Sequence, residues 1–189
     1  MISNIEETLI TVLKDKGMET ALSLMDVVKM VHTSFRKDGV TPYTHHLFDV
    51  ALKACRLPGS LENREAIVCL GLLHDMPEDY PEYMDAQKFR ATIENSFHGI
   101  TMKAELPRII ENAYLLSKKN RDGTDKSKQT YFDEMKGNPM CILVKGCDGL
   151  SSLLDTPSSK DVKFMHYYIR YTRKYHIPLL ETLETQAAN

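Results

Sequence analysis

The chain has 189 residues, 42% of them hydrophobic and 26% charged, which predicts one globular domain spanning residues 1–189. Its 24 basic and 26 acidic residues leave a formal net charge of −2, so the composition does not support a nucleic-acid-binding protein or one attracted to acidic membranes. No apolar run approaches the roughly 20 residues that a membrane span needs.

The cysteines indicate the cellular compartment. They share no C-x-x-C spacing and follow no export signal, which predicts reduced thiols in a cytoplasmic protein. A zinc finger is not expected from such spacing. The four residues are Cys55, Cys69, Cys141 and Cys147.

The first half of the chain shows helical periodicity, with apolar residues recurring every three or four positions. A capping box of Ser3 and Glu6 opens the first segment, and Thr41 followed by Pro42 opens the third. The fourth segment is apolar around much of its circumference near its end, which is typical of a central, buried helix. The expected helices cover residues 3–17, 19–37, 41–57 and 60–76, the last one stopped by Pro77.

The second half is also helical. Pro107 is expected to begin its helix, and Pro178 to bend or break the last one. Gly146 and Gly149 each cost a helix interior about 1 kcal/mol relative to alanine, so we expect close packing or a ligand near the backbone there. No strand pattern of comparable strength is present, and the fold class is predicted as all-α with eight or nine helices. The expected helices lie near residues 85–97, 107–116, 127–136, 139–154 and 158–183, with a polar loop over 117–127.

Three polar islands interrupt the apolar helical segments: residues 45–46, residues 74–79 and Asp148. Unpaired charges at such positions are costly, and together the islands offer imidazole and carboxylate groups, the ligand types that suit a divalent metal. Packing between helices is how such distant side chains meet in all-α metal proteins. His45 and His46 are about 100° apart around a helix, so only one of them can face the same centre, and His45 is expected to be structural.

Four segments resemble, in order, those of a known superfamily. Residues 36–51 read R-K-D-G-V-T-P-Y-T-H-H-L-F-D-V-A, residues 71–79 read G-L-L-H-D-M-P-E-D, residues 144–148 read V-K-G-C-D, and residues 175–179 read Y-H-I-P-L. This series is similar to the HD superfamily of metal-dependent phosphohydrolases. Within it, the likeness points to the guanosine tetraphosphate hydrolase domain of the RelA/SpoT proteins and their small stand-alone relatives. The resemblance covers residues 25–180 and implies an HD-type helical bundle.

The resemblance implies a divalent metal, with manganese the first expectation and iron, zinc or magnesium as alternatives. It places the metal on four residues: His46, His74, Asp75 and Asp148. Such an ion would polarise a phosphoryl oxygen and lower the pKa of its bound water. Glu78 and Asp79 are expected to position that water and transfer its proton. The expected reaction removes pyrophosphate from the 3′ position of guanosine tetraphosphate or pentaphosphate.

The expected substrate contacts are less specific, and they comprise Arg36, Lys37, Lys145 and Ser152. For the first two, a helix terminus that favours basic residues is an equal alternative to base contact. The family reads R-L-H-N-M after the final aspartate, whereas residues 149–153 here read G-L-S-S-L, and Leu47 replaces a proline. These departures spare the expected metal ligands and bear on substrate identity.

Two alternatives to the alarmone hydrolase remain open. One is an HD phosphohydrolase acting on another nucleotide or a phosphomonoester, and the other is a non-catalytic nucleotide-binding regulator, against which the intact pair Glu78 and Asp79 argues. In each case the partner is a small nucleotide, with no nucleic acid and no membrane expected, and the oligomeric state is open. The remaining histidines are expected to be structural: His32, His98, His166 and His176.

Overall fold

The computed structural model describes residues 4–36, 38–57, 64–155 and 162–187, and within these ranges the protein is built from helices with no strand. The first group is α1 (Ile5–Asp15), α2 (Glu19–Val31), α3 (Thr44–Cys55), α4 (Arg64–Leu73) and the short α5 (Met76–Asp79). The second is α6 (Ala86–Ile93), α7 (Gly99–Leu116), α8 (Lys128–Met135), α9 (Pro139–Asp155), α10 (Val162–Tyr171) and α11 (Ile177–Ala187).

Short helical turns complete the described chain. Two 3-10 turns cover Pro81–Met84 and Glu94–Ser96, and a π turn over Thr172–His176 joins α10 to α11 without a break. Counting α10 and α11 as one continuous helix, the described residues hold nine helices of eight residues or more. The predicted all-α class with eight or nine helices is confirmed.

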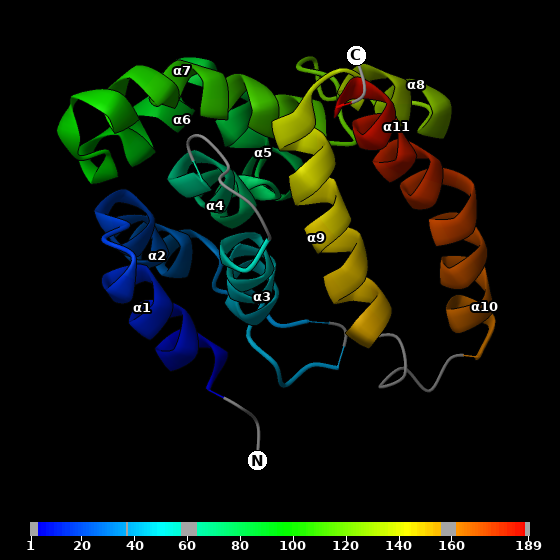
Figure 1. Cartoon of the computed structure of the whole chain (residues 1–189), viewed down its shortest axis with the longest axis horizontal. Helices are drawn as coiled ribbons and strands as arrows, with labels where there is room; N and C mark the ends of the chain where they lie inside the picture. The colour runs from blue at the N-terminus through cyan, green and yellow to red at the C-terminus, as the bar shows by residue number, and fades with distance from the viewer. Residues whose placement is uncertain (1–3, 37, 58–63, 156–161, 188–189) are drawn as a thin grey trace.

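Helix α4 lies at the centre of the assembly (Figure 1). It packs against α2, α3, α7 and α9, while α1 packs on the outside of α3 and α11 on the outside of α9. Every residue of α4 from Ala66 to Leu73 is buried, which agrees with its apolar circumference. Full burial of a leucine side chain contributes about 1.5–3 kcal/mol, so α4 supplies much of the core.

Helix α2 ends at Val31 and not at Lys37, which lies outside the described residues. A tight hairpin follows, in which Phe35 pairs with Pro42 and the Arg36 N–H donates to the Thr41 carbonyl at 2.8 Å. The Asp38 carboxylate accepts hydrogen bonds from the backbone N–H groups of the two residues before Pro42, both at 2.9 Å. An aspartate that bonds the backbone just ahead of it favours a turn over a helix, which explains the early end.

The same hairpin moves the start of α3. Thr41 and Pro42 belong to the hairpin, and α3 begins at Thr44 with Tyr43 as its N-cap residue, so the expected cap at Thr41 is wrong. The residue before a proline favours extended backbone, which suits Thr41 to a strand-like pair better than to a helix. At the first helix, Asn4 caps α1 by accepting from the Glu7 N–H, and Ser3 lies outside the described residues.

Pro107 and Pro77 occupy positions in their helices that differ from those expected. Pro107 lies inside α7, which begins at Gly99, and Leu106, Ile109 and Ile110 are buried around it. A proline inside a helix costs about 3 kcal/mol or more, and this buried face offsets that loss. Pro77 does not stop α4 but lies in the first turn of α5, where a missing N–H is tolerated.

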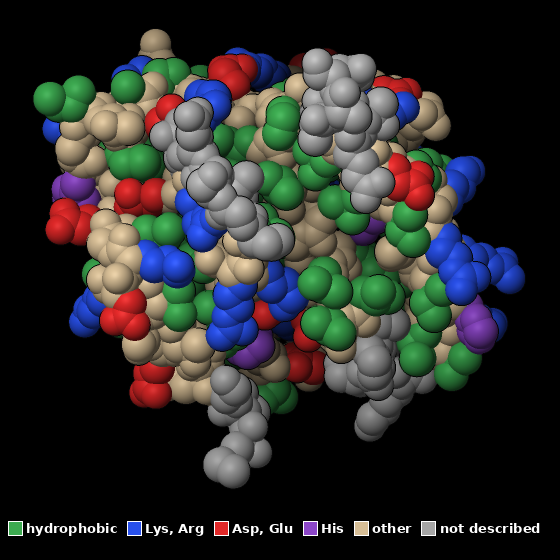
Figure 2. Space-filling view, in the orientation of Figure 1, with side chains coloured by type: hydrophobic (Ala, Val, Ile, Leu, Met, Phe, Trp, Pro, Cys, Tyr) green, Lys and Arg blue, Asp and Glu red, His purple; other side chains and the backbone are tan. Residues whose placement is uncertain are grey.

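The mixed charges of the surface and the free thiols are those that the amino-acid composition predicts. On the face shown in Figure 2, acidic and basic side chains are mixed, and apolar side chains gather between α9 and the α10–α11 pair. None of the described helices combines the length and the apolar character that crossing a bilayer requires. All four cysteines are free and buried, and burial raises the pKa of Cys55 and Cys147 to about 11 and that of Cys141 to about 12.

Candidate metal centre

Three elements bring the expected metal ligands together. His46 lies in the first turn of α3, His74 and Asp75 form the turn between α4 and α5, and Asp148 lies in the middle of α9. Because α4 packs against both α3 and α9, residues far apart in sequence meet at one end of α4. His74 is 2% exposed, His46 4% and Asp148 9%, so the cluster is almost closed to solvent.

The side-chain atoms converge tightly. One ligand atom from each of His46, His74 and Asp148 lies within 4.8 Å of the other two. The Nε2 of His46 is 3.1 Å from Asp148 Oδ1, and the Nε2 of His74 is 4.0 Å from the same oxygen. Asp75 lies at the edge of this set, with Oδ1 3.3 Å from His74 Nε2 and Oδ2 3.9 Å from His46 Nε2. The structure therefore brings all four expected ligands to one place.

The hydrogen bonds fix which nitrogen of His74 faces the cluster. Its Nδ1 is 2.8 Å from the Gly71 carbonyl oxygen, which can only accept, so Nδ1 carries the proton. The other nitrogen, Nε2, then presents a lone pair and has no hydrogen-bond partner among the described residues although it is fully buried. A buried, unpartnered Nε2 turned toward carboxylate oxygens can bind a cation between them.

His46 is held in the same way. Its Nδ1 lies 3.1 Å from the Ser151 hydroxyl, and that hydroxyl also bonds the Asp49 carboxylate. Burial raises the pKa of Asp49, but hydrogen bonds from Lys53 and Ser151 lower it by a larger amount. The carboxylate is therefore ionised and can only accept. Ser151 therefore donates to Asp49 and accepts from Nδ1–H of His46. Nε2 of His46 is left to face Asp148, 3.1 Å from its Oδ1.

Lys145 restrains the remaining oxygen of Asp148. Its Nζ lies 2.6 Å from Asp148 Oδ2, and it is itself only 5% exposed. Burial alone would raise the pKa of Asp148, but the Lys145 charge and the hydrogen bond to His46 hold it well below its usual range. The carboxylate is thus ionised, with Oδ1 toward the histidines and Oδ2 toward the lysine. The Ser152 hydroxyl lies 3.5 Å from Oδ1, at the limit of a hydrogen bond.

A tyrosine holds Asp75. The Tyr43 hydroxyl donates to Asp75 Oδ2 at 2.7 Å. Burial, followed by the charges of Asp75 and Asp79, raises the pKa of Tyr43 far above its usual range, so it stays protonated and remains a donor. Burial raises the pKa of Asp75, but the neighbouring histidines lower it by a larger amount, so the net change is a lower pKa.

The two acidic residues of α5 have different environments. Glu78 accepts hydrogen bonds from Lys118 twice, from the backbone N–H at 3.0 Å and from Nζ at 2.6 Å. Asp79 remains exposed, and no cation is bonded to it among the described residues. Partial burial, then the charges of Asp75 and Glu78, raise the pKa of Asp79 to about 6. Glu78 is therefore anchored by Lys118, whereas Asp79, which Tyr43 hydrogen-bonds, has a pKa close enough to neutrality to exchange a proton.

The remaining expected contacts are scattered. Arg36 forms an ion pair with Asp155 at 3.0 Å, which ties the hairpin before α3 to the end of α9. Lys37 lies outside the described residues. Lys145 and Ser152 do lie beside the metal cluster, through their contacts with Asp148.

Two glycines of α9 mark a close helix contact. A Cβ on Gly149 would lie 2.2 Å from His176 Nδ1, and a Cβ on Gly146 would lie 2.8 Å from Leu180 Cδ2. His176 is 3% exposed, and neither ring nitrogen has a hydrogen-bond partner among the described residues. Burial, then the Lys145 charge, lower its pKa to about 4, so the ring is neutral at pH 7. Close packing of the π turn and α11 on α9 accounts for both glycines.

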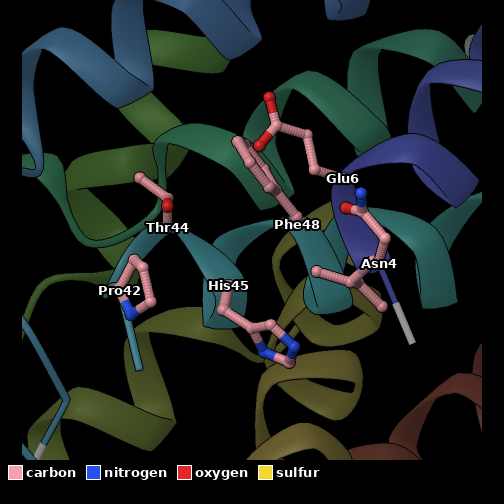
Figure 3. Close-up of a pocket in the computed structure, with 7 residues that line it drawn as sticks. Asn4, Glu6, Pro42, Thr44, His45 and Phe48 are labelled. Atoms are coloured by element: carbon pink, nitrogen blue, oxygen red, sulfur yellow. The ribbon is translucent and has the colours of Figure 1, made fainter. Parts of the chain in front are cut away.

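A separate surface hollow of about 320 Å³ lies where the N-terminus of α1 meets the start of α3 (Figure 3). Residues from both helices line it, among them Asn4, Glu6 and His45, while the neighbouring His46 belongs to the buried cluster. His45 therefore points away from the metal cluster, as the 100° spacing predicts.

No family model, curated protein or solved structure matches the chain. The chemistry of the donor set must therefore carry the interpretation. Two imidazole nitrogens and two carboxylates suit a divalent cation, and the buried Nε2 of His74 has no hydrogen-bond partner among the described residues.

Sequence reasoning missed Tyr43, Ser151 and His32. Tyr43 bonds Asp75 and lies within the first motif segment, three residues before His46, whereas Ser151 bonds His46 and lies just beyond the third motif, three residues after Asp148. This i, i+3 spacing on a helix was a usable signal, because it puts two side chains on one face. His32 stacks on the Tyr43 ring from the end of α2, and no spacing in the sequence relates the two.

Proposed function

We propose that the protein is a metal-dependent phosphohydrolase of the HD type. One observation carries the proposal: hydrogen bonds turn the Nε2 atoms of His46 and His74 toward the carboxylates of Asp75 and Asp148. A divalent cation bound there would polarise a phosphoryl oxygen and acidify its water. The order and spacing of the motifs that resemble HD enzymes support the same function.

The chain's own residues supply the remaining chemistry. Asp79, exposed beside the cluster and with a pKa of about 6, is suited to accept the proton of an attacking water. Glu78 fixes the exposed ammonium of Lys118 beside α5, whereas Lys145 is buried against Asp148. An exposed ammonium near a metal site favours a phosphate-bearing substrate.

The first substrate that we propose is guanosine 3′,5′-bis(diphosphate), hydrolysed at the 3′ position to release pyrophosphate. The motifs at residues 36–51, 71–79 and 144–148 that resemble those of alarmone hydrolases support this choice. The free, buried thiols support placing the protein in the cytoplasm.

A second candidate, another nucleotide or a phosphomonoester, is favoured by Gly149. The resembling family carries arginine directly after the final aspartate, whereas here the His176 ring occupies the space of any side chain at that position. A cation that would contact substrate from position 149 is therefore absent, and the substrate can differ.

The test is turnover of a phosphate panel by the purified protein with manganese. The panel comprises guanosine tetraphosphate, guanosine pentaphosphate, nucleoside triphosphates and monophosphates, and p-nitrophenyl phosphate, with pyrophosphate and orthophosphate measured separately. Pyrophosphate from the alarmones supports the first candidate, and orthophosphate from a monoester supports the second. No turnover of any member overturns the enzyme proposal.

A matched pair of variants links turnover to the cluster. His46→Asn is expected to abolish turnover, because it removes the Nε2 lone pair. His45→Asn is expected to leave turnover unchanged, since His45 lines the separate hollow shown in Figure 3. Equal loss in both variants would show that the damage is not specific to the cluster.

A further inference from the structure

Asp75 has little local support for its orientation. It occupies the N-cap position of α5, yet its side chain makes no capping hydrogen bond to that helix. The hydrogen bond that restrains it comes instead from Tyr43, whose hydroxyl donates to Oδ2 at 2.7 Å. With Oδ2 held there, Oδ1 lies 3.3 Å from His74 Nε2.

The Tyr43 ring is held in turn from two sides. Its backbone N–H donates to the Ser34 carbonyl at 2.9 Å, which anchors the residue in the hairpin before α3. The His32 ring lies parallel to the Tyr43 ring, with the planes 9° apart and the centroids at 5.3 Å, and Tyr80 packs edge-on against the same histidine at 4.9 Å.

His32 makes no polar contact that would explain its presence. It is 2% exposed, and neither ring nitrogen has a hydrogen-bond partner among the described residues. Its interactions with Tyr43 and Tyr80 are therefore those of a flat ring. His32 acts as a platform that fixes the plane of Tyr43, and thereby the direction of the Tyr43 hydroxyl.

We propose that Tyr43, backed by the His32 ring, is a positioning residue that holds Asp75 in the orientation required for metal binding. The inference rests on the proposed metal centre, and it adds a support for one ligand that acts from outside the ligand set. Without the hydroxyl, Asp75 is free to turn toward the N–H groups of α5 that it leaves uncapped. The remaining ligands, His46, His74 and Asp148, keep their own hydrogen bonds.

The experiment measures manganese affinity by titration calorimetry on the full chain, together with the EPR spectrum of bound manganese. Tyr43→Phe keeps the stacked ring and removes the hydroxyl, so we expect affinity to fall about 10–100-fold, the range for loss of a partner of a metal ligand. The melting temperature of the metal-free variant is expected to stay close to that of the wild type, which separates positioning from folding.

Three further variants sharpen the result. Tyr80→Phe removes a hydroxyl from the neighbouring ring, which does not bond Asp75, and is expected to keep wild-type affinity. His32→Phe keeps a flat ring under Tyr43 and is expected to keep wild-type affinity, whereas His32→Ala removes the platform and is expected to weaken binding.

The outcomes separate the positioning role of Tyr43 from the metal centre and from the proposed function. Equal manganese affinity in Tyr43→Phe and the wild type overturns the positioning proposal and leaves the metal centre intact. A wild-type chain that binds no manganese, zinc or magnesium overturns the metal centre and the positioning role together. Weaker binding in Tyr43→Phe with no turnover of any phosphate supports the positioning role and overturns only the proposed function.

Discussion

The Nζ of Lys145 and the Oδ2 of Asp148 lie 2.6 Å apart inside the protein, one helical turn from each other on α9. This buried pair leaves the second carboxylate oxygen to the histidines, with His46 Nε2 at 3.1 Å. The lysine therefore helps to set the geometry of the cluster without belonging to the ligand set.

Removal of Lys145 is expected to be costly. Lys145→Met leaves Asp148 as a buried charge without its ammonium partner, and breaking such a pair costs about 3–5 kcal/mol. The free energy of unfolding, measured by urea titration of the metal-free variant, should fall by about that amount. Saturating manganese should restore part of it, because the cation then compensates the same carboxylate. A loss below about 1 kcal/mol would show that this pair contributes no more than a surface ion pair.

His74→Asn tests the orphaned nitrogen directly. The asparagine amide can replace Nδ1 as the donor to the Gly71 carbonyl, while nothing replaces Nε2. Metal affinity is expected to fall at least about 100-fold while the stability of the metal-free protein changes little, since one unpaired buried atom is removed. Calorimetric titration with manganese and thermal melts in EDTA measure the two quantities. His74→Gln, which lacks the donor at the Nδ1 position, serves as the comparison and should lose stability as well.

The raised pKa of Asp79 predicts how its contribution to stability changes with pH. Partial burial and the charges of Asp75 and Glu78 raise its pKa from 3.8 to about 6 in the metal-free protein. Because the folded state holds this proton more tightly than the unfolded state, the stability that Asp79 contributes is present below about pH 4 and is lost as pH rises through 6. The carboxyl ¹³C shift of Asp79, followed by NMR, should titrate with a midpoint near 6.

Two changes should lower that midpoint. Asp75→Asn removes one of the charges that raise it, and magnesium, which is diamagnetic, would cancel the same charge when bound. A midpoint that stays near 6 with saturating magnesium would place the cation away from Asp75.

The contact between α9 and the π turn predicts unequal effects of two alanines. Gly149→Ala puts a Cβ 2.2 Å from the ring of His176, and such overpacking costs about 1–3 kcal/mol. Gly146→Ala meets only the mobile end of Leu180, and the gain in helix propensity, about 1 kcal/mol, offsets much of the clash. Urea denaturation should give Gly149→Ala a clearly lower free energy of unfolding than Gly146→Ala. In the double variant with His176→Ala, the Gly149→Ala penalty should shrink; an unchanged penalty would locate the clash elsewhere.

Much of the helical framework was predictable from the sequence because apolar periodicity is a local property. The buried circumference of α4 and the close packing at Gly146 and Gly149 follow from such patterns. The boundaries were less predictable where side chains compete with the backbone. The carboxylate of Asp38 and the pair between Phe35 and Pro42 form a hairpin where the apolar pattern alone continues α2.

For the candidate site, the sequence indicated which residues meet but not how they are oriented. The grouping of His46, His74 and Asp148 depends on spacing and on helix packing. The tautomers depend on Gly71 and Ser151, whose roles arise only when α3, α4 and α9 are packed together. The separate roles of Glu78 and Asp79 depend on Lys118, which is 40 residues away in the chain.

The cysteines give this protein a practical advantage for measuring motion. With all four thiols buried and their pKa values raised, they present little thiolate to an alkylating or spin-labelling reagent at pH 7. A cysteine introduced at the exposed Ile100 or Val40 would then react alone. Paired labels at such positions would report, by dipolar distance measurements on the otherwise native chain, whether the hairpin before α3 shifts relative to α7 when substrate arrives.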